Sequence, residues 1–501
     1  MPRALLFNPP GPRVQRSEDR CQGDVDELAA ADLRACNDLG LLAAILRRLG
    51  FQPTIRDYPA ERGTWADLER DLRDLTPDLA LMSITSSTLL DDLHAFELAK
   101  AIRPDTLTVA KGAFFSICDV SALTDPRFRF LDVGITGEAE WVLPELLAAY
   151  KSPPTAVGGR SNDSPTVNPQ SAIRSPQFPS VRGVIYWRAG RLVRTPDADF
   201  HRDLDALPFP ARDLMPNHLY LRPDTGHPMA TIQTGRGCPC QCIFCPAPIV
   251  SGKVLRQRSP ANIVDEVEEC VTRYGIRDFF FRADTFTLDR RFVIAVCEDI
   301  LRRGLEVEWV ANSRVKPLDA EELDWMRRAG CWLVALGIEF GSDEALARTR
   351  KQTTLDDARR AVALCREAGI KTLGYYLIGL PWETRADIDQ TIRFGRELDC
   401  DFVEVHIVTP FEGTELWTLS RDAGLLRGST LGSDYLTRPA AGTLHLTASD
   451  LIALRRRALR ALYLNPSHIA RLVLGVRSPA QFANYFRYGL RLVRRVLRRG
   501  R

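Results

Sequence analysis

The sequence has no run of 18 or more apolar residues among its 501 positions, so it predicts no membrane-spanning helix. The apolar stretch within Met1–Pro10 is too short for a secretory signal and is expected to form a first strand. Nothing in the sequence indicates an oxidising compartment, so the twelve cysteines are expected to be reduced thiols. These absences predict a protein of the cytoplasm.

Acidic residues and lysine are absent after Asp450, where thirteen arginines occur. Leu490, Val493 and Leu497 are spaced to share one face of a terminal helix. Basic residues surround this face at Arg491, Arg494, Arg495, Arg498 and Arg499. The pattern fits a solvated helix, docking on an acidic partner, or contact with the inner face of an anionic membrane. Membrane contact would favour a lipid-like substrate. No nucleic-acid recognition fold accompanies the charge, so nucleic-acid binding is not expected.

A chain of 501 residues is too long for one hydrophobic core and predicts two or three domains. Its 45% apolar and 26% charged residues are typical of a globular protein. We expect a first domain at 1–150, a linker with a hairpin at 151–225, a second domain at 226–430 and a helical basic region at 431–501.

Three cysteines in a C-x3-C-x2-C pattern, Cys238, Cys242 and Cys245, are the strongest chemical signal in the chain. A zinc site would need a fourth ligand from a second C-x2-C or a histidine pair, and the sequence as far as Cys270 supplies neither. Three thiolates on a [4Fe–4S] cluster leave one iron open to another ligand. The spacing therefore indicates an iron–sulfur site, with Cys240 as a non-ligand.

Residues 1–150 alternate short apolar strands with helices, which predicts an α/β fold with a doubly wound, Rossmann-like parallel sheet. Ligands of such sheets bind at the carboxyl ends of the strands. Small, hydroxyl or acidic residues follow these ends at Ser83, Thr85, Gly112, Gly137 and Glu138. Small residues let a planar ligand approach the backbone, but ordinary loops use the same residue types.

A second alternation of strands and helices begins at Met229 and contains six units. The strands are expected at 229–233, 278–282, 307–311, 333–339, 372–378 and 402–408. This pattern predicts a partial (β/α)6 barrel related to the TIM barrel, with its chemistry at the carboxyl ends of the strands. Polar or small residues stand there at Asp284, Arg314, Glu339 and Gly379, where a loop-bracing role is equally open.

The cysteine loop, with Phe244 before its last cysteine, resembles the signature of the radical S-adenosylmethionine (AdoMet) enzymes. Gly-Ile-Glu-Phe-Gly-Ser at 337–342, Ile-Gly-Leu-Pro at 378–381 and Thr-Pro-x-x-Gly-Thr at 409–414 follow in the order of that family. The resemblance implies a [4Fe–4S] cluster on the three cysteines and AdoMet at the open iron. The implied AdoMet contacts are Phe244, Asp284, Ser313, Arg314, Glu339 and Gly379.

The first 150 residues resemble the cobalamin-binding domain that precedes the radical AdoMet core in one large subfamily. The resemblance rests on Asn-Pro-Pro at 8–10, a hydroxyl-rich strand end, a glycine and a Gly-Glu-x-Glu segment. It implies that cobalamin contacts Ser83, Thr85, Gly112, Gly137 and Glu138. His94 lacks the Asp-x-His-x-x-Gly context of a cobalt-ligating histidine. We therefore expect cobalamin without a histidine lower ligand, or a domain that has lost the cofactor.

The resemblance implies a radical AdoMet enzyme that uses cobalamin to methylate an unactivated carbon of an apolar small molecule. It also implies an electron donor such as flavodoxin or ferredoxin. An alternative is a cyclase or rearrangement enzyme of the anaerobic magnesium-protoporphyrin ester cyclase type, acting on a tetrapyrrole without net methyl transfer. A non-catalytic cobalamin or iron–sulfur protein, such as a sensor, is the alternative of another class.

Overall fold

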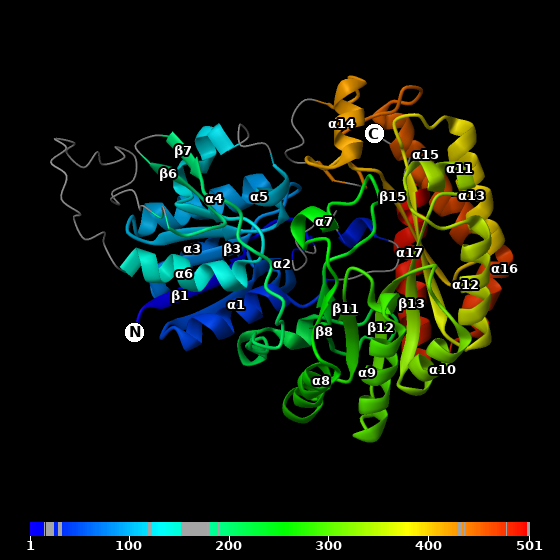
Figure 1. Cartoon of the computed structure of the whole chain (residues 1–501), viewed down its shortest axis with the longest axis horizontal. Coiled ribbons are helices and arrows are strands. Elements are labelled where there is room, and N and C mark those ends of the chain that lie inside the picture. The colour runs from blue at the N-terminus through cyan, green and yellow to red at the C-terminus, as the bar shows by residue number, and fades with distance from the viewer. Residues whose placement is uncertain are drawn as a thin grey trace. The chain divides into compact units, whose positions relative to one another are not determined.

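The computed structural model describes residues 1–14, 16, 25–28, 33–118, 123–151, 178, 180–188, 191–427, 433–434, 436–476 and 478–497. Its chain forms two compact units (Figure 1). The first contains Met1–Gln22, Cys36–Pro216 and Ile249–Ser251, and the second contains Gly23–Ala35, Asn217–Pro248 and Gly252–Arg501.

The first unit is built on a seven-stranded sheet in the order β2-β1-β3-β4-β5-β6-β7. The strands are β1 (Arg3–Asn8), β2 (Gln52–Asp57), β3 (Leu79–Ser83), β4 (Leu107–Lys111), β5 (Val133–Ile135), β6 (Val184–Arg188) and β7 (Arg191–Arg194). The first five are parallel to one another. This arrangement confirms the predicted doubly wound sheet.

Helices follow the strands of this sheet along the chain. They are α1 (Asn37–Arg48), α2 (Tyr58–Glu61), α3 (Trp65–Leu75), α4 (Leu89–Ile102), α5 (Ala113–Ile117) and α6 (Ala139–Lys151). Helix α1 contacts α6, and α3 contacts α4, which is the pairing expected when helices cover both faces of a parallel sheet. The strands β3 and β4 are buried along their whole length, as a sheet covered on both faces requires.

The predicted hairpin after residue 183 is present, but it is part of the first sheet. Strand β6 pairs antiparallel with β5, and β7 pairs antiparallel with β6. Val184, Ile185 and Tyr186 are buried, so an apolar strand is attached to the open edge at β5. The segment expected to be a linker therefore contributes two strands to this unit, while its residues 152–177 lie outside the described part of the chain.

The second unit contains a six-stranded sheet in the order β15-β14-β13-β12-β11-β8. The strands are β8 (Met229–Gln233), β11 (Asp278–Arg282), β12 (Glu308–Arg314), β13 (Cys331–Glu339), β14 (Lys371–Ile378) and β15 (Phe402–Ile407). All neighbours are parallel. The six predicted strands are thus confirmed, and their sequential order is that of a partial (β/α)6 barrel.

Successive helices of the second unit pack on one another, α8 on α9, α9 on α10, α10 on α12, α12 on α13 and α13 on α15 (Figure 1). They are α8 (Pro260–Tyr274), α9 (Arg290–Arg302), α10 (Ala320–Arg328), α11 (Asp343–Arg348), α12 (Leu355–Glu367), α13 (Arg385–Leu398), α14 (Glu415–Asp422) and α15 (Ala448–Tyr463). Capping boxes begin α12 at Thr354 and Asp357, and α13 at Thr384 and Asp387. These capping boxes fix the residue at which each of the two helices begins. They therefore also fix where the loop that precedes each helix ends.

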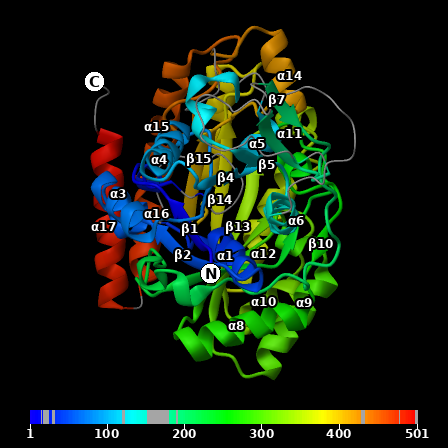
Figure 2. The same cartoon turned by 90° about the vertical axis from the view of Figure 1, so that its left-hand side faces the viewer.

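The basic C-terminal region is helical, as predicted. It ends with α16 (Pro466–Leu474) and α17 (Pro479–Leu497), drawn in red in Figure 2. No helix among the described residues is long and apolar enough to cross a membrane. The side chains of Val493 and Leu497 lie outside the described part of the structure, as do Arg498 and Arg499.

Candidate functional site

The cysteine loop begins immediately after β8 and is closed at its base by a short antiparallel ribbon. Strands β9 (Gly235–Arg236) and β10 (Arg256–Gln257) form this ribbon, and the loop between them includes α7 (Ala247–Val250). The amide of Cys238 donates to the carbonyl of Gly252 at 3.1 Å. These bonds hold the ends of the loop together at the carboxyl end of β8, where barrel chemistry is expected.

Gly237 and Asp284 join the cysteine loop to the neighbouring strand β11. Gly237 has φ of +88°, a conformation that glycine adopts at low cost. Its amide donates to a carboxylate oxygen of Asp284 at 2.8 Å. The resemblance implies that Asp284 contacts AdoMet, and the structure shows that its carboxylate braces the loop. The AdoMet role stays a prediction.

The four thiols of the loop differ in their surroundings. Cys238 is buried, and Cys240, Cys242 and Cys245 are half-buried. A hydrogen bond between the first two thiols raises the pKa of Cys238 and lowers that of Cys240 to about 6. Burial raises the pKa of Cys242, although Lys351 and Arg314 oppose this effect. Two cations therefore favour the thiolate form that an iron–sulfur cluster requires.

No three His, Cys, Asp or Glu side chains in the described part of the chain converge as they would around a single metal ion. The ligands of one zinc ion all lie about 2.0–2.3 Å from it, so convergence is the mark of a mononuclear site. A [4Fe–4S] cluster takes each thiolate on a different iron. Three thiolates, those of Cys238, Cys242 and Cys245, are a donor set that a [4Fe–4S] cluster can take.

A buried group of charges lies beside the cysteine loop and includes one residue that the sequence analysis missed. The guanidinium of Arg314 lies 3.8 Å from the sulfur of Cys242 and donates to the carbonyl of Lys351. The ammonium of Lys351 lies 2.6 Å from a carboxylate oxygen of Glu339. Two of the predicted residues, Arg314 and Glu339, are thus brought together through Lys351.

Lys351 is only 5% exposed and stands between two residues with positive φ, Arg350 at +53° and Gln352 at +59°. Such conformations are uncommon for residues other than glycine. They turn the backbone on both sides of Lys351, whose side chain reaches Glu339. Nothing in the sequence around Lys351 indicates that its side chain reaches Glu339. The sequence analysis therefore missed this residue.

Three other predicted AdoMet residues have local structural partners. The hydroxyl of Ser313 lies 2.5 Å from that of Thr287, and the ring of Phe244 packs edge to face on Phe340 at 6.0 Å. Gly379 has φ of +99° and donates its amide to Glu383 at 2.6 Å. These contacts explain each residue structurally, and the AdoMet contacts stay predictions.

The strand ends of the first unit carry a buried ion pair that was not predicted. Ser83 donates its hydroxyl to Asp38 at 2.5 Å, and the Lys111 ammonium lies 2.6 Å from the same carboxylate. All three side chains are buried. Ser83 was predicted as a ligand contact; its hydroxyl bonds to this pair, and the ligand contact stays a prediction. Asp38 lies 73 positions from Lys111, so local pattern could not have linked them.

A second polar group at this edge surrounds Thr85. Its hydroxyl lies 2.8 Å from that of Thr88, which donates to Asp92 at 2.8 Å. Arg16 pairs with Asp92 and donates to the carbonyl of Ser83 at 3.2 Å. The Nε and Nη2 atoms of Arg16 are buried without a hydrogen-bond partner among the described residues. A buried donor of this kind is costly unless a ligand supplies the acceptor.

The two predicted glycines of the first unit differ in the space around them. A Cβ atom on Gly112 would lie 2.5 Å from the carbonyl oxygen of Ile84, whereas one on Gly137 would meet no atom within 4 Å. Both have positive φ, +136° and +71°. Glu138 is buried beside Gly137. Gly112 is therefore required by packing, and Gly137 leaves open space at the carboxyl end of β5.

Comparison with known proteins supports the resemblance seen in the sequence. Residues 232–395 match the model of the Radical SAM superfamily. An uncharacterised methyltransferase of Pyrococcus horikoshii is 28% identical over 428 residues, covering 85% of this chain and 87% of that protein. The anaerobic magnesium-protoporphyrin IX monomethyl ester cyclase of Cereibacter sphaeroides is 28% identical over 71% of this chain, which spans 55% of the cyclase.

The fold of the whole chain has a solved counterpart. The radical S-adenosylmethionine methyltransferase TsrM from Kitasatospora setae, solved with tryptophan and a SAM analogue bound, superposes with a TM-score of 0.69. The match covers 99% of this chain and 100% of that one at 18% identity. At this identity the likeness shows a shared fold. The predicted resemblance is confirmed for residues 232–395, the part of the chain that matches the Radical SAM superfamily model.

Proposed function

We propose that this protein is a cobalamin-dependent radical AdoMet enzyme that transfers a methyl group to an unactivated carbon. One observation carries the proposal. A C-x3-C-x2-C loop stands directly after the first strand of a radical SAM domain, in a chain whose other unit is a doubly wound parallel sheet. The methyltransferase name of the Pyrococcus relative, which aligns with 85% of the chain, supports methyl transfer.

In this proposal Cys238, Cys242 and Cys245 hold a [4Fe–4S] cluster. The cluster, when bound, supplies the electron that cleaves AdoMet to a radical. The nearby charges suit the two ends of the AdoMet amino acid group: Arg314 would bind its carboxylate, and Asp284 its ammonium. Glu339 would accept hydrogen bonds from the ribose. Phe244, Ser313 and Gly379 complete the proposed AdoMet contacts.

The strand ends of the first unit fit cobalamin in two respects. Gly137 leaves open space beside Glu138, and Arg16 has buried donors without an acceptor among the described residues. Cobalamin carries amide and phosphate oxygens that can accept such bonds. Ser83, Thr85, Gly112, Gly137 and Glu138 remain the proposed contacts. His94 forms an exposed ion pair with Glu97 on α4, which supports cobalamin binding without a histidine lower ligand.

The substrate class and the electron donor are further parts of the proposal. The named relatives favour an apolar small molecule, since one acts on a magnesium-protoporphyrin ester. A flavodoxin or ferredoxin would supply the electron. The experiment that tests the core of the proposal needs neither, because radical AdoMet chemistry can be followed without the natural substrate or donor.

The decisive experiment is anaerobic reconstitution of the full chain with iron, sulfide and cobalamin, followed by reduction in the presence of AdoMet. Absorbance reports cluster and cobalamin, and mass spectrometry reports 5′-deoxyadenosine. We expect Cys238→Ala, Cys242→Ala and Cys245→Ala each to lose the cluster band and the product. Cys240→Ala lies in the same loop and is the matched control that keeps both. A wild-type protein that binds no cobalamin would overturn the assignment of the first unit.

A second candidate is a cyclase without net methyl transfer, favoured by the similarity to the magnesium-protoporphyrin ester cyclase. Methyl transfer consumes AdoMet to S-adenosylhomocysteine, while a cyclase yields only 5′-deoxyadenosine. AdoMet with a labelled methyl group therefore separates the two. Formation of S-adenosylhomocysteine that depends on cobalamin supports the methyltransferase, and its absence supports the cyclase. Absence of both products would identify a non-catalytic binding protein.

A further inference from the structure

Three buried polar side chains at the carboxyl edge of the first sheet hold atoms without hydrogen-bond partners. They are Asn8, at the end of β1, Arg16, which follows that strand, and Thr136, directly after β5. Their exposed fractions are 6%, 4% and 2%. Asn8 Oδ1, Arg16 Nε and Nη2, and Thr136 Oγ1 are buried and have no partner among the described residues. Because such atoms are costly, the group indicates a ligand that supplies the missing bonds.

The unpartnered groups are spread widely along this edge. Strand β1 pairs with β3, β3 with β4, and β4 with β5. Asn8 and Thr136 are therefore separated by three strand spacings, or about 14 Å. Arg16 lies between them at the end of β3, since it donates to the carbonyl of Ser83 at 3.2 Å. A ligand that pairs with all three must be broad.

The middle of the edge is already paired within the protein. The Ser83 hydroxyl donates to Asp38 at 2.5 Å, and the Lys111 ammonium lies 2.6 Å from the same carboxylate. Gly112 follows β4 without a side chain, and a Cβ atom on Gly137 would meet no atom within 4 Å. The edge thus combines a paired centre with unpartnered polar groups on both sides. This arrangement suits a broad ring that carries polar groups at its rim.

The three side chains differ in the hydrogen bonds that they can make. The Arg16 guanidinium only donates, Asn8 Oδ1 only accepts, and the Thr136 hydroxyl does either. A phosphate or carboxylate oxygen only accepts, so it would suit Arg16 and leave Asn8 unsatisfied. The Arg16 guanidinium is also already paired with the Asp92 carboxylate. A carboxamide offers both a donor and an acceptor, so it can pair with all three side chains.

We propose that Asn8, Arg16 and Thr136 recognise a corrinoid through the carboxamides at the rim of its ring, and not through its nucleotide phosphate. Recognition of this kind rests on the proposed function, in which the first unit binds cobalamin, and it identifies the part of the cofactor that the protein reads. A corrin ring carries amide side chains around its periphery. Because the three side chains are buried, binding requires a local shift at the strand ends.

The test compares the binding of three corrinoids to the full chain by equilibrium dialysis, without AdoMet or a reductant. Hydroxocobalamin has the amides and the nucleotide, aquacyanocobinamide has the amides but no nucleotide, and cobyrinic acid has carboxylates in place of the amides. We expect cobinamide to bind at least as tightly as cobalamin. Cobyrinic acid should bind at least about tenfold more weakly, because it leaves a buried acceptor unsatisfied.

Two variants remove the proposed contacts with little change in side-chain volume. Thr136→Val and Asn8→Leu should each weaken the binding of cobinamide by about three- to tenfold, as expected for one neutral hydrogen bond. Asn8→Leu should also narrow the discrimination against cobyrinic acid. Without a corrinoid, Thr136→Val should melt no lower than wild type, because the hydroxyl that it removes has no partner among the described residues.

Thr106→Val is the matched control. Thr106 is buried at the opposite, amino edge of the sheet, just before β4, and its hydroxyl donates to the carbonyl of Pro77 at 2.8 Å. This variant should melt at a lower temperature than wild type and bind all three corrinoids unchanged. The contrast with Thr136→Val separates a ligand contact from a structural hydrogen bond.

Three results would overturn the proposal and leave cobalamin binding intact. They are a preference of about tenfold or more for cobalamin over cobinamide, equal binding of cobinamide and cobyrinic acid, and unchanged binding of cobinamide to both Thr136→Val and Asn8→Leu. Failure of the wild-type chain to bind any of the three corrinoids would overturn both this proposal and the assignment of cobalamin to the first unit.

Discussion

The ammonium group of Lys351 lies 2.6 Å from the Glu339 carboxylate, and both side chains are largely buried beside the cysteine loop. The backbone carbonyl of Lys351 accepts a hydrogen bond from Arg314, whose guanidinium also approaches Cys242. Lys351 therefore connects two proposed AdoMet residues to a proposed cluster ligand.

Removing the lysine should leave a buried carboxylate without its partner. We expect Lys351→Met to lower the free energy of unfolding by about 3 kcal/mol, measured by urea denaturation. Glu339→Gln/Lys351→Met removes both charges and should recover most of this loss. If Glu339 also binds the ribose, the double variant will still fail to form 5′-deoxyadenosine. A stable double variant with full AdoMet cleavage would show that the pair has only a structural role.

Gly112 and Gly137 offer a matched pair in the first unit. Gly112→Ala places a Cβ atom 2.5 Å from the carbonyl oxygen of Ile84, so we expect a loss of stability of about 3 kcal/mol or more. Gly137→Ala meets no neighbour and should cost only about 1–2 kcal/mol from its positive φ. Because that methyl group enters the open space, cobalamin affinity should fall in Gly137→Ala. Unchanged affinity would place cobalamin elsewhere.

Glu383 should make stability depend on pH. Burial raises its pKa to about 7, although the amides of Leu380 and Gly379 oppose this effect. The folded state then holds a proton that the unfolded state releases above its pKa of about 4.3. Stability should therefore fall as pH rises between these two values, by at most about 4 kcal/mol.

Glu383→Gln is neutral at every pH and should remove this part of the slope. Denaturant unfolding at pH 5, 6, 7 and 8 measures the effect. The exposed Glu367→Gln is the control and should keep the wild-type slope. A smaller slope will remain, because burial also raises the pKa of Glu322, to about 8. An identical slope in wild type and Glu383→Gln would contradict the assignment.

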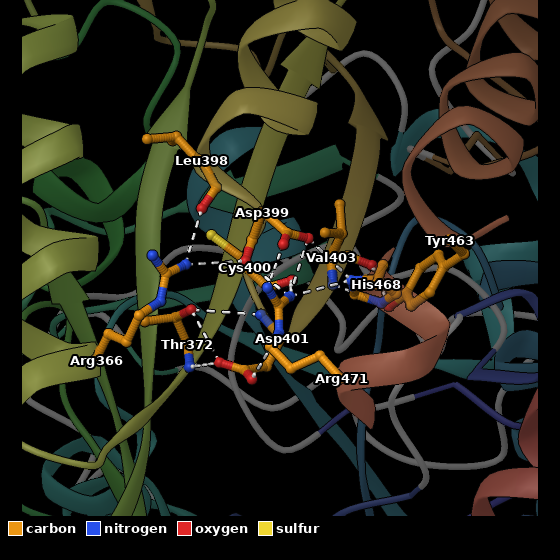
Figure 3. Close-up of polar contacts among 10 residues, drawn as sticks. All are labelled: Arg366, Thr372, Leu398, Asp399, Cys400, Asp401, Val403, Tyr463, His468 and Arg471. Carbon is orange, nitrogen blue, oxygen red and sulfur yellow. Dashed lines mark hydrogen bonds and ion pairs between the residues drawn. The ribbon is translucent and has the colours of Figure 1, made fainter. Parts of the chain in front are cut away.

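The ion pair of Arg471 with Asp399 (Figure 3) should hold α16 in place. Burial raises the pKa of Asp399, but the hydrogen bonds from Arg471 outweigh this effect and the net pKa is lowered. We expect Arg471→Met to cost about 1–2 kcal/mol and to increase hydrogen exchange in residues 466–474. Arg457→Met removes an exposed pair with Asp389 and should cost less than about 0.5 kcal/mol. Equal effects would show that the anchor contributes no more than a surface pair.

The sequence was sufficient for the strands and for their order along the barrel. Alternating apolar strands and helices are local features of the sequence. The strand Met229–Gln233 and the five later strands of the barrel could therefore be located from the pattern of apolar and polar residues. The cysteine spacing is also local, and it identified the radical SAM domain correctly. In both cases the information lies within a few residues of the feature that it predicts.

The charged groups around the sites could not be predicted, because their members are far apart in sequence. Lys351 reaches Glu339 and Arg314 only after the chain has folded, and Lys111, at the end of β4, meets Asp38, in the first turn of α1. No periodicity encodes such pairs. The sequence also gave no reason to attach β6 to β5, since a hairpin alone does not indicate which sheet it joins.

That hairpin has a consequence for solution behaviour. A parallel sheet that ended at β5 would expose a buried-type strand, Val133–Ile135, whose backbone groups could pair with another chain. The edge is instead β7, a four-residue strand that begins and ends with arginine. The opposite edge, β2, contains Pro53, which cannot donate to a further strand. Both edge strands are thus poor templates for pairing with another chain. Deletion of residues 184–194 should therefore increase the formation of β-rich aggregates.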